Sequence, residues 1–302
     1  MVDYTQETVL VFGGTGFLGK NLQHSRYLPK WRFLGRQYDL LDANTIKQLL
    51  ETIKPAAILN LAASVGGIQY NMAHQPEQLY QNSMMALNLI EAAYQTGIPR
   101  VLSTISTCAW PSDGLCEDDL FNGPPAETNI AYGMAKRLLF LMSREYSRKY
   151  GVVYNTVALN NLYGPHDLFD EMRSHFVTVL IYRHLVSKDY TLLGTGMPTR
   201  QFTFVADVAR LLPRFLNEYF DIHESMFVST PESWTIGEMA LIAGNIMNCE
   251  FDFVAGAKEL GQLNKLVDSS KLMSFLNNKN YQFSLFKDGF EETYKWYKGY
   301  CT

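Results

Sequence analysis

The chain has 302 residues, of which 47% are hydrophobic and 19% are charged, with a formal net charge of −4, and this length suits one large domain or two smaller ones. The acidic balance, without a long basic run or an apolar run near roughly 18 residues, excludes bulk attraction to nucleic acid and argues against a membrane protein. The N-terminus has no signal pattern and the four cysteines are scattered, so we expect a reduced cytoplasmic protein with no metal site.

The first predicted element is a strand that leads directly into a glycine-rich turn. Residues 8–12 form a short apolar run, and glycines follow at positions 13, 16 and 19. Between a strand and a helix start, this spacing permits a tight turn and a close backbone approach to a pyrophosphate. A simple turn is the alternative interpretation. We predict a dinucleotide site formed by Gly13, Thr15, Gly16, Phe17, Leu18 and Gly19.

The second predicted strand, over residues 32–34, ends at Gly35 and Arg36. An acidic residue at this position would accept the ribose 2′-hydroxyl of NAD, whereas an arginine would meet the 2′-phosphate of NADP. Arg36 therefore favours NADP(H), and a solvated surface arginine is the alternative. Asp42 is expected to cap the following helix.

The next two predicted strands are apolar. Residues 56–61 form a continuous run of the kind that is buried on both faces of a parallel sheet. The small residues at 62–67 then leave room for a ligand at the strand end. A helix is predicted over 75–96, and a strand over 100–106 delivers Ser106.

A helix predicted over residues 129–150 carries Tyr132 and Lys136. Their spacing of four places both side chains on one helix face. An ammonium beside a phenol lowers the pKa of the phenol, which could then exchange protons near neutral pH. Ser106 could hold a carbonyl oxygen against that phenol. We interpret the three residues as a site that polarises a C=O or C–OH group.

With a strand predicted at 152–159, strands and helices alternate through the first half of the chain, which predicts a Rossmann-type doubly wound parallel sheet of α/β class. The glycine turn, Arg36, residues 62–67 and Ser106 all fall at the ligand-binding ends of its strands. Helices near 207–218, 235–247 and 285–298 and strands near 191–193, 226–228 and 251–254 complete the chain. We expect an NADP-binding domain over 1–165 and 200–230, and a smaller α+β domain over 166–199 and 231–302 that closes over the strand ends.

Longer motifs add a family resemblance that runs from residue 8 to about 296. They are Asn-Leu-Ala-Ala-Ser-Val-Gly-Gly-Ile at 60–68, Ser-Thr-Cys at 106–108, Asn-Leu-Tyr-Gly-Pro-His-Asp at 161–167 and Gly-Thr-Gly-x-Pro-x-Arg-Gln-Phe at 194–202. Together they resemble the GDP-L-fucose synthase family of extended short-chain dehydrogenases/reductases. The resemblance implies an enzyme that uses NADPH for 3,5-epimerisation and C4 reduction of a GDP-4-keto-6-deoxy-mannose-type sugar, giving GDP-L-fucose or a close analogue.

In that family a cysteine and a histidine move the protons on C3 and C5 of the sugar. Cys108 matches the cysteine, and His175 matches the histidine by its place in the helix after Gly-Pro-His-Asp. Both side chains titrate within reach of neutral pH, which suits proton transfer at a keto-sugar. The alternatives are a small buried thiol for Cys108 and a surface or core histidine for His175.

The resemblance also implies binding residues. Further cofactor contacts are expected from Leu61, Ala62, Ala63, Lys136, Leu159, Asn161, Leu162 and His175. Substrate contacts are expected from Val65, Gly66, Thr107, Cys108, Tyr132, Asn161, Phe176, Val177, Arg200 and Lys265. Arg200 would meet a phosphate, with a surface salt bridge as the alternative. Leu193 departs from the family pattern, which commonly has tryptophan there.

Two other functions stay open. One is a reductase that acts only at C4, on a related GDP-4-keto-6-deoxy sugar such as a GDP-6-deoxy-heptose. The other is a dinucleotide-sensing scaffold without catalysis, which the intact Ser106, Tyr132 and Lys136 oppose. The resemblance further implies a homodimer, built by packing the helix around 76–96 and the Tyr132 helix into a four-helix bundle.

Overall fold

The computed structural model describes residues 2–25, 28–111, 116–171, 173–254, 263–276 and 281–301. Its central feature is a six-stranded sheet in the order β10-β5-β4-β3-β1-β2, in which every neighbouring pair is parallel. The strands are β1 (Val9–Phe12), β2 (Trp31–Phe33), β3 (Ala57–Asn60), β4 (Arg100–Ser106), β5 (Val153–Leu159) and β10 (Met226–Val228). This arrangement confirms the predicted doubly wound α/β fold.

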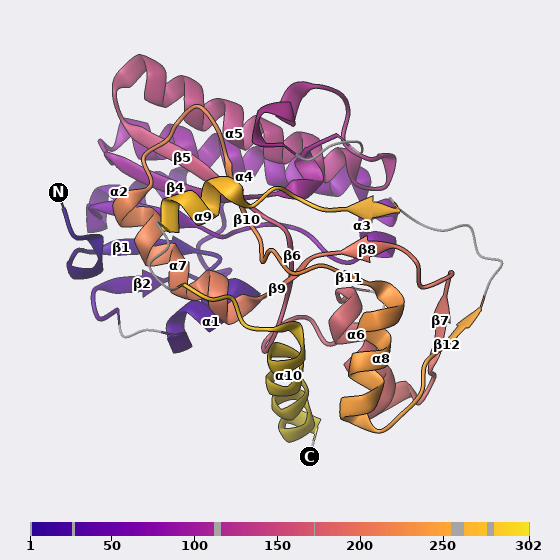
Figure 1. Cartoon of the computed structure of the whole chain (residues 1–302). Helices are drawn as coiled ribbons and strands as arrows, with labels where there is room; N and C mark the ends of the chain where they lie inside the picture. Colours follow the sequence, from indigo (N-terminus) through magenta and orange to yellow (C-terminus); the bar gives the residue numbers. More distant parts are fainter. Residues whose placement is uncertain are drawn as a thin grey trace.

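Helices cover both faces of the sheet (Figure 1). One face packs against α2 (Ala43–Ile53), α4 (Gln75–Gln95) and α5 (Ile130–Tyr150). The opposite face packs against α1 (Phe17–Ser25), α7 (Val205–Glu218) and α9 (Ser270–Leu276). Successive side chains of a strand point to opposite faces, and both faces here are buried, which explains the continuous apolar runs of the sequence.

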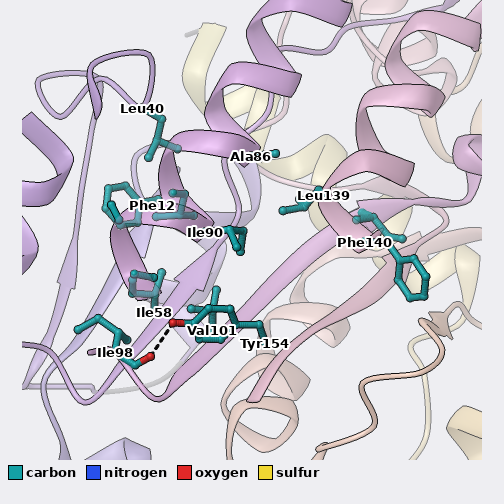
Figure 2. Packing of buried hydrophobic residues seen from close by; sticks show 14 of the residues in the cluster. Phe12, Leu40, Ile58, Ala86, Ile90, Ile98, Val101, Leu139, Phe140 and Tyr154 are labelled. Atoms are coloured by element: carbon teal, nitrogen blue, oxygen red, sulfur yellow. Dashed lines mark hydrogen bonds between the residues drawn. The ribbon is translucent and has the colours of Figure 1, made fainter. Parts of the chain in front are cut away.

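Figure 2 shows the core on the α4 and α5 side. Phe12, Ile58 and Val101 come from three neighbouring strands and meet Ile90 of α4. The neighbours of these residues along the strands, such as Val11 and Leu59, belong to the core on the other face. The pairing register of the strands is therefore fixed by the cores on both faces of the sheet. A slip by one residue would turn the side chains of each core toward the opposite face.

A third apolar core lies beside the carboxyl ends of the strands. It joins α6 (Phe176–Tyr182), α8 (Ile236–Met247) and α10 (Phe286–Cys301) to the parallel strands β6 (Asn161–Tyr163) and β9 (Phe202–Phe204). Two small sheets accompany it (Figure 1): β11 (Trp234–Thr235), β8 (Thr199–Arg200) and β13 (Asn264–Lys265), and the pair β12 (Asp252–Val254) and β7 (Thr191–Leu193).

Most predicted elements are present, but the sequence analysis did not identify α9 or the short strands β6, β8, β9, β11 and β13. The sequence analysis missed α3 (Ile68–Ala73), because the glycines before it and its short length conceal the helical period. His175 lies immediately before α6 as its N-cap residue, whereas we expected it inside that helix. Short segments also adopt 3-10 or π geometry: Tyr4–Gln6, Thr107–Ala109, Glu117–Phe121, Glu127–Asn129 and Arg183–Ser187. Within the described ranges, no helix has the length and apolar character needed to cross a bilayer.

Candidate active site

A cleft of about 1350 Å³ opens at the carboxyl ends of the central strands, where they face the third core. All the residues predicted to bind the cofactor or the substrate line it except Val177. The side chain of Val177 is fully buried in the third core, because it lies on the inner face of α6. The prediction that the Val177 side chain contacts the substrate is therefore wrong. Val179, on the same helix, lines the cleft instead.

The glycine turn is closed tightly against the end of β3. Gly13 has a φ of +74°, and a Cβ built on it would lie 2.8 Å from the backbone nitrogen of Ala62. At Gly19 a Cβ would lie 2.5 Å from the Gly13 carbonyl oxygen. Only glycine fits these positions without moving the backbone. The turn thus leads directly into the N-terminus of α1. The helix dipole and the N–H groups of the first helical turn favour binding of a pyrophosphate there. Arg36 lines the cleft together with the glycine turn.

Ser106, Tyr132 and Lys136 all line the cleft. Ser106 ends β4, while the other two project from the first turns of α5. The Nζ atom of Lys136 lies 5.6 Å from the centre of the Tyr132 ring and donates a hydrogen bond to the Thr104 carbonyl oxygen at 3.3 Å. Tyr132 and Lys136 are both buried.

The protonation of this pair differs from the sequence-based expectation. Burial, supported by the charge of Cys108, raises the pKa of Tyr132, and burial lowers the pKa of Lys136 to about 8. The ammonium lies over the ring face and binds a carbonyl oxygen, so it does not offset the burial of the phenol. Tyr132 is consequently protonated at neutral pH, which suits it to give a proton to a substrate oxygen.

Cys108 lies in the 3-10 turn Thr107–Ala109 that follows β4. Its backbone N–H donates to the Ser106 hydroxyl oxygen at 3.2 Å, which caps the turn. The Nζ atom of Lys265 lies 3.2 Å from the sulfur of Cys108. Burial raises the pKa of the thiol, but the charge of Lys265, hydrogen bonds from Ser106 and Lys265, and the charge of His175 outweigh it and leave the pKa below its ordinary value.

His175 is paired with a residue that the sequence analysis did not single out. Its Nδ1 lies 3.3 Å from Oδ2 of Asp167, a buried carboxylate that also accepts a 2.8 Å hydrogen bond from the Thr178 hydroxyl. Burial lowers the pKa of His175, but the charge and hydrogen bond of Asp167, together with Cys108, leave it raised. The only available signal for Asp167 was its place at the end of Gly-Pro-His-Asp.

Buried amides hold the loop after β3, another feature that sequence reasoning missed. The Gly66 N–H donates to Asn71 Oδ1 at 3.1 Å, and the Ser64 N–H donates to Asn82 Oδ1 at 3.0 Å. Asn71 also donates to Asn129 Oδ1 at 2.9 Å, just before the helix that carries Tyr132. The loop after β3 is therefore tied by side-chain hydrogen bonds to the residue that precedes the Tyr132 helix.

Arg200 lies on β8 and lines the cleft. Its Nη1 donates to the carbonyl oxygens of Thr199 at 2.8 Å and of Leu263 at 3.2 Å. These bonds fix the guanidinium at the cleft wall next to β13, the strand that carries Lys265.

Comparison with known proteins supports the same interpretation of the cleft. The family model described as "NAD dependent epimerase/dehydratase family" matches residues 9–237. A probable GDP-L-fucose synthase of Drosophila melanogaster is 34% identical to the chain, and the match covers 96% of each protein. A GDP-L-fucose synthetase of Naegleria fowleri, solved with bound NADP, is 28% identical with a TM-score of 0.86, covering 97% of this chain and 94% of that one.

A GDP-6-OMe-4-keto-L-xylo-heptose reductase of Campylobacter jejuni has a TM-score of 0.88 at 22% identity, covering 98% of this chain and 99% of that one. At this identity the likeness concerns the fold alone. The family model and the Drosophila relative both extend over the glycine turn and the Ser106, Tyr132 and Lys136 cluster. The chain therefore belongs to the NAD dependent epimerase/dehydratase family and, within it, to the GDP-L-fucose synthase group.

Proposed function

We propose that this protein is an NADPH-dependent enzyme that epimerises a GDP-4-keto-6-deoxy-mannose-type sugar at C3 and C5 and reduces it at C4, giving GDP-L-fucose or a close analogue. The observation that carries this proposal is the presence in one cleft of two different chemical sets. Ser106, Tyr132 and Lys136 can serve a ketone reduction, while Cys108 and His175 can serve proton transfer at carbon.

The residues around the glycine turn fit the cofactor, since a Cβ at Gly13 would fill the cradle against Ala62. Arg36 would bind the 2′-phosphate, and Lys136 would bind the nicotinamide ribose. When bound, NADPH supplies the hydride for C4 of the sugar. The other proposed cofactor contacts are those of the cleft wall: Thr15, Gly16, Phe17, Leu18, Gly19, Leu61, Ala62, Ala63, Leu159, Asn161, Leu162 and His175.

Epimerisation would use Cys108 and His175 on opposite faces of the sugar. The 4-keto group acidifies the C–H bonds at C3 and C5. The Cys108 thiolate accepts one such proton, so that the C–H bond breaks, an S–H bond forms and the electron pair moves to the keto oxygen as an enolate. His175 gives a proton to the other face of the same carbon. Asp167 supports the charged imidazole that must give this proton.

Reduction would use Ser106, Tyr132 and Lys136. The Ser106 hydroxyl donates a hydrogen bond to the C4 oxygen and holds it against Tyr132. The Tyr132 hydroxyl then gives its proton to that oxygen as the C4 centre is reduced. The raised pKa of Tyr132 keeps this proton in place until the oxygen becomes more basic. Val65, Gly66, Thr107, Asn161, Phe176, Arg200 and Lys265 are the proposed sugar-nucleotide contacts.

The second candidate function is C4 reduction alone, on a related GDP-4-keto-6-deoxy sugar such as a GDP-6-deoxy-heptose. The observation that favours it is Leu193, which is 67% exposed, lines the cleft and replaces the tryptophan common in the GDP-L-fucose synthase family. A small aliphatic side chain at this wall leaves more room for a larger substrate.

The decisive test is incubation of the protein with GDP-4-keto-6-deoxy-mannose in D2O without NADPH. We expect NMR to detect deuterium at both C3 and C5, and NADPH added afterwards to yield GDP-L-fucose. Reduction without prior deuterium incorporation would leave only the C4 reductase. A parallel panel of GDP-4-keto-6-deoxy hexoses and heptoses identifies the substrate, and no NADPH oxidation with any of them would contradict both functions.

The two ligands are expected to bind to different domains of the chain. We propose that residues 1–165 and 200–230 bind NADP(H) and that 166–199 and 231–302 bind the sugar nucleotide. The third apolar core supports this division in outline, because most of it comes from α6, α8 and α10 of the proposed second domain. Tyr163, Phe202 and Phe204 join it from the proposed first domain, and α9 of the second packs on the central sheet. Four free cysteines also suit the reducing cytoplasm, which cell fractionation would test.

We further propose a homodimer formed by α4 and α5, which pack side by side (Figure 1). Tyr80 and Leu87 on α4, and Met134 and Leu141 on α5, are exposed apolar residues spaced by two helical turns. Light scattering should give twice the chain mass of 34.4 kDa. Leu87→Glu with Leu141→Glu should yield monomers, whereas the matched control Leu241→Glu on α8 should stay dimeric. A parent protein that is monomeric would contradict this part.

A further inference from the structure

The contact between Lys265 and Cys108 joins two residues that lie 157 positions apart in the chain. The Lys265 ammonium donates to the Cys108 sulfur at 3.2 Å. An ammonium binds a thiolate as a charge-assisted pair, whereas its interaction with a neutral thiol is weak. The geometry therefore favours the deprotonated form of this cysteine.

The backbone that carries Lys265 is held in place from two sides. β13 pairs in parallel with β8, and the Thr199 N–H donates to the Leu263 carbonyl oxygen at 2.9 Å. Beyond the strand, the Val267 N–H donates to Oε1 of the buried Gln201 at 2.8 Å. The backbone of Lys265 is therefore fixed by β8 and Gln201, and this places its side chain in the cleft against the sulfur of Cys108.

Other titratable groups also face Cys108 from the elements around it. They are His175 before α6 and Tyr132 of α5, with Lys136 one turn beyond Tyr132. His175 acts in the same direction as Lys265, because a protonated imidazole also favours a thiolate. Lys265 lies 3.2 Å from the sulfur, and Ser106 also hydrogen-bonds the thiol. Substitution of Lys265 leaves Ser106 and His175 in place and so separates the lysine's contribution.

We propose that Lys265 is a positioning residue that holds Cys108 as a thiolate ion pair before substrate binds. The inference deepens the proposed function and rests on it for its purpose, which is to provide the base for epimerisation. The thiol loses its proton to solvent, the S–H bond breaks, and the ammonium stays charged. The thiolate is then ready to form an S–H bond with a proton from C3 or C5. This role differs from the nucleotide contact expected from the sequence.

The test is the rate of Cys108 alkylation by iodoacetamide as a function of pH, because the thiolate is the reacting form. Cys108 and Cys116 share the tryptic peptide 101–136, so a Cys116→Ser background lets mass spectrometry report Cys108 alone. No sugar is needed. In Lys265→Met the pH midpoint of alkylation should rise by about one to three pH units, with at least about tenfold slower labelling at pH 7.

Lys265→Arg keeps a positive charge and should restore most of the labelling at pH 7. Lys295→Met removes an exposed lysine on α10 and should match the parent. Thermal melting establishes that each variant is folded. An unchanged midpoint in Lys265→Met, or an arginine variant that behaves like the methionine variant, would overturn the inference. If the midpoint rises but the parent incorporates no deuterium at C3 or C5, the ion pair stands and the epimerase function fails.

Discussion

Tyr132→Phe is expected to lower kcat for ketone reduction by about 10²–10⁴-fold, equivalent to about 3–5 kcal/mol of transition-state stabilisation. In the proposed mechanism the phenol gives a proton to the C4 oxygen, and burial keeps it protonated at neutral pH. Among the described residues, none is hydrogen-bonded to the Tyr132 hydroxyl, so its loss leaves no partner unsatisfied. The folded structure and NADPH binding should therefore stay close to those of the parent.

The measurement is single-turnover NADPH oxidation with a pre-epimerised 4-keto sugar, alongside a fluorescence titration of NADPH binding. Tyr70→Phe is a matched control, because Tyr70 also lines the cleft but lies on α3 and not on the helix that carries Lys136. Full turnover by Tyr132→Phe would refute the proton-donor role. An equal loss in the Tyr70 variant would instead indicate a general sensitivity of the cleft.

Cys108→Ser should slow deuterium exchange at C3 and C5 by about 10²–10⁴-fold, while reduction of a pre-epimerised ketone falls by much less. The neighbours of the thiol leave its pKa below the ordinary value, so a larger fraction is thiolate at neutral pH than for a free cysteine. A serine hydroxyl stays protonated throughout the working pH range. Raising the pH should therefore not rescue the serine variant.

NMR detection of deuterium in D2O without NADPH measures the first rate, and NADPH oxidation with the pre-epimerised ketone measures the second. Cys116→Ser is the control, since Cys116 is exposed and lies eight positions further along the chain. Equal losses in exchange and in reduction would mean that Cys108 serves the structure of the turn at 107–109. A separation of the two rates would assign it to epimerisation.

Residues that act through local sequence were predictable. Apolar runs buried on both faces indicated the parallel sheet, and the ligand-binding ends of its strands then located the glycine turn, Arg36 and Ser106 together. Tyr132 and Lys136 could be paired because their spacing is a property of any helix. Cys108 and His175 were assigned from family motifs, so they could be predicted to act in one site without knowledge of how distant segments pack.

Residues that act across the fold could not be assigned in this way. Asn71 and Asn82 lie on helices, where polar side chains are usually solvated, yet their amides are buried and bind the loop after β3. Val177 had the sequence context of a cleft residue, but the direction in which α6 packs placed it in the core. Helix orientation depends on the whole third core, which no local pattern encodes.

The amino-acid sequence alone therefore predicted the fold class, which the structure confirms, because it depends on short-range periodicity. It also supplied the proposed cofactor and catalytic residues, through local spacing and family motifs. Tertiary structure decided the pKa values of Tyr132 and Cys108. Burial, not the nearby lysine, governs the pKa of Tyr132, and Lys265 reaches Cys108 from a strand 157 residues away. Both effects arise from desolvation and charge proximity, which exist only once distant segments have packed.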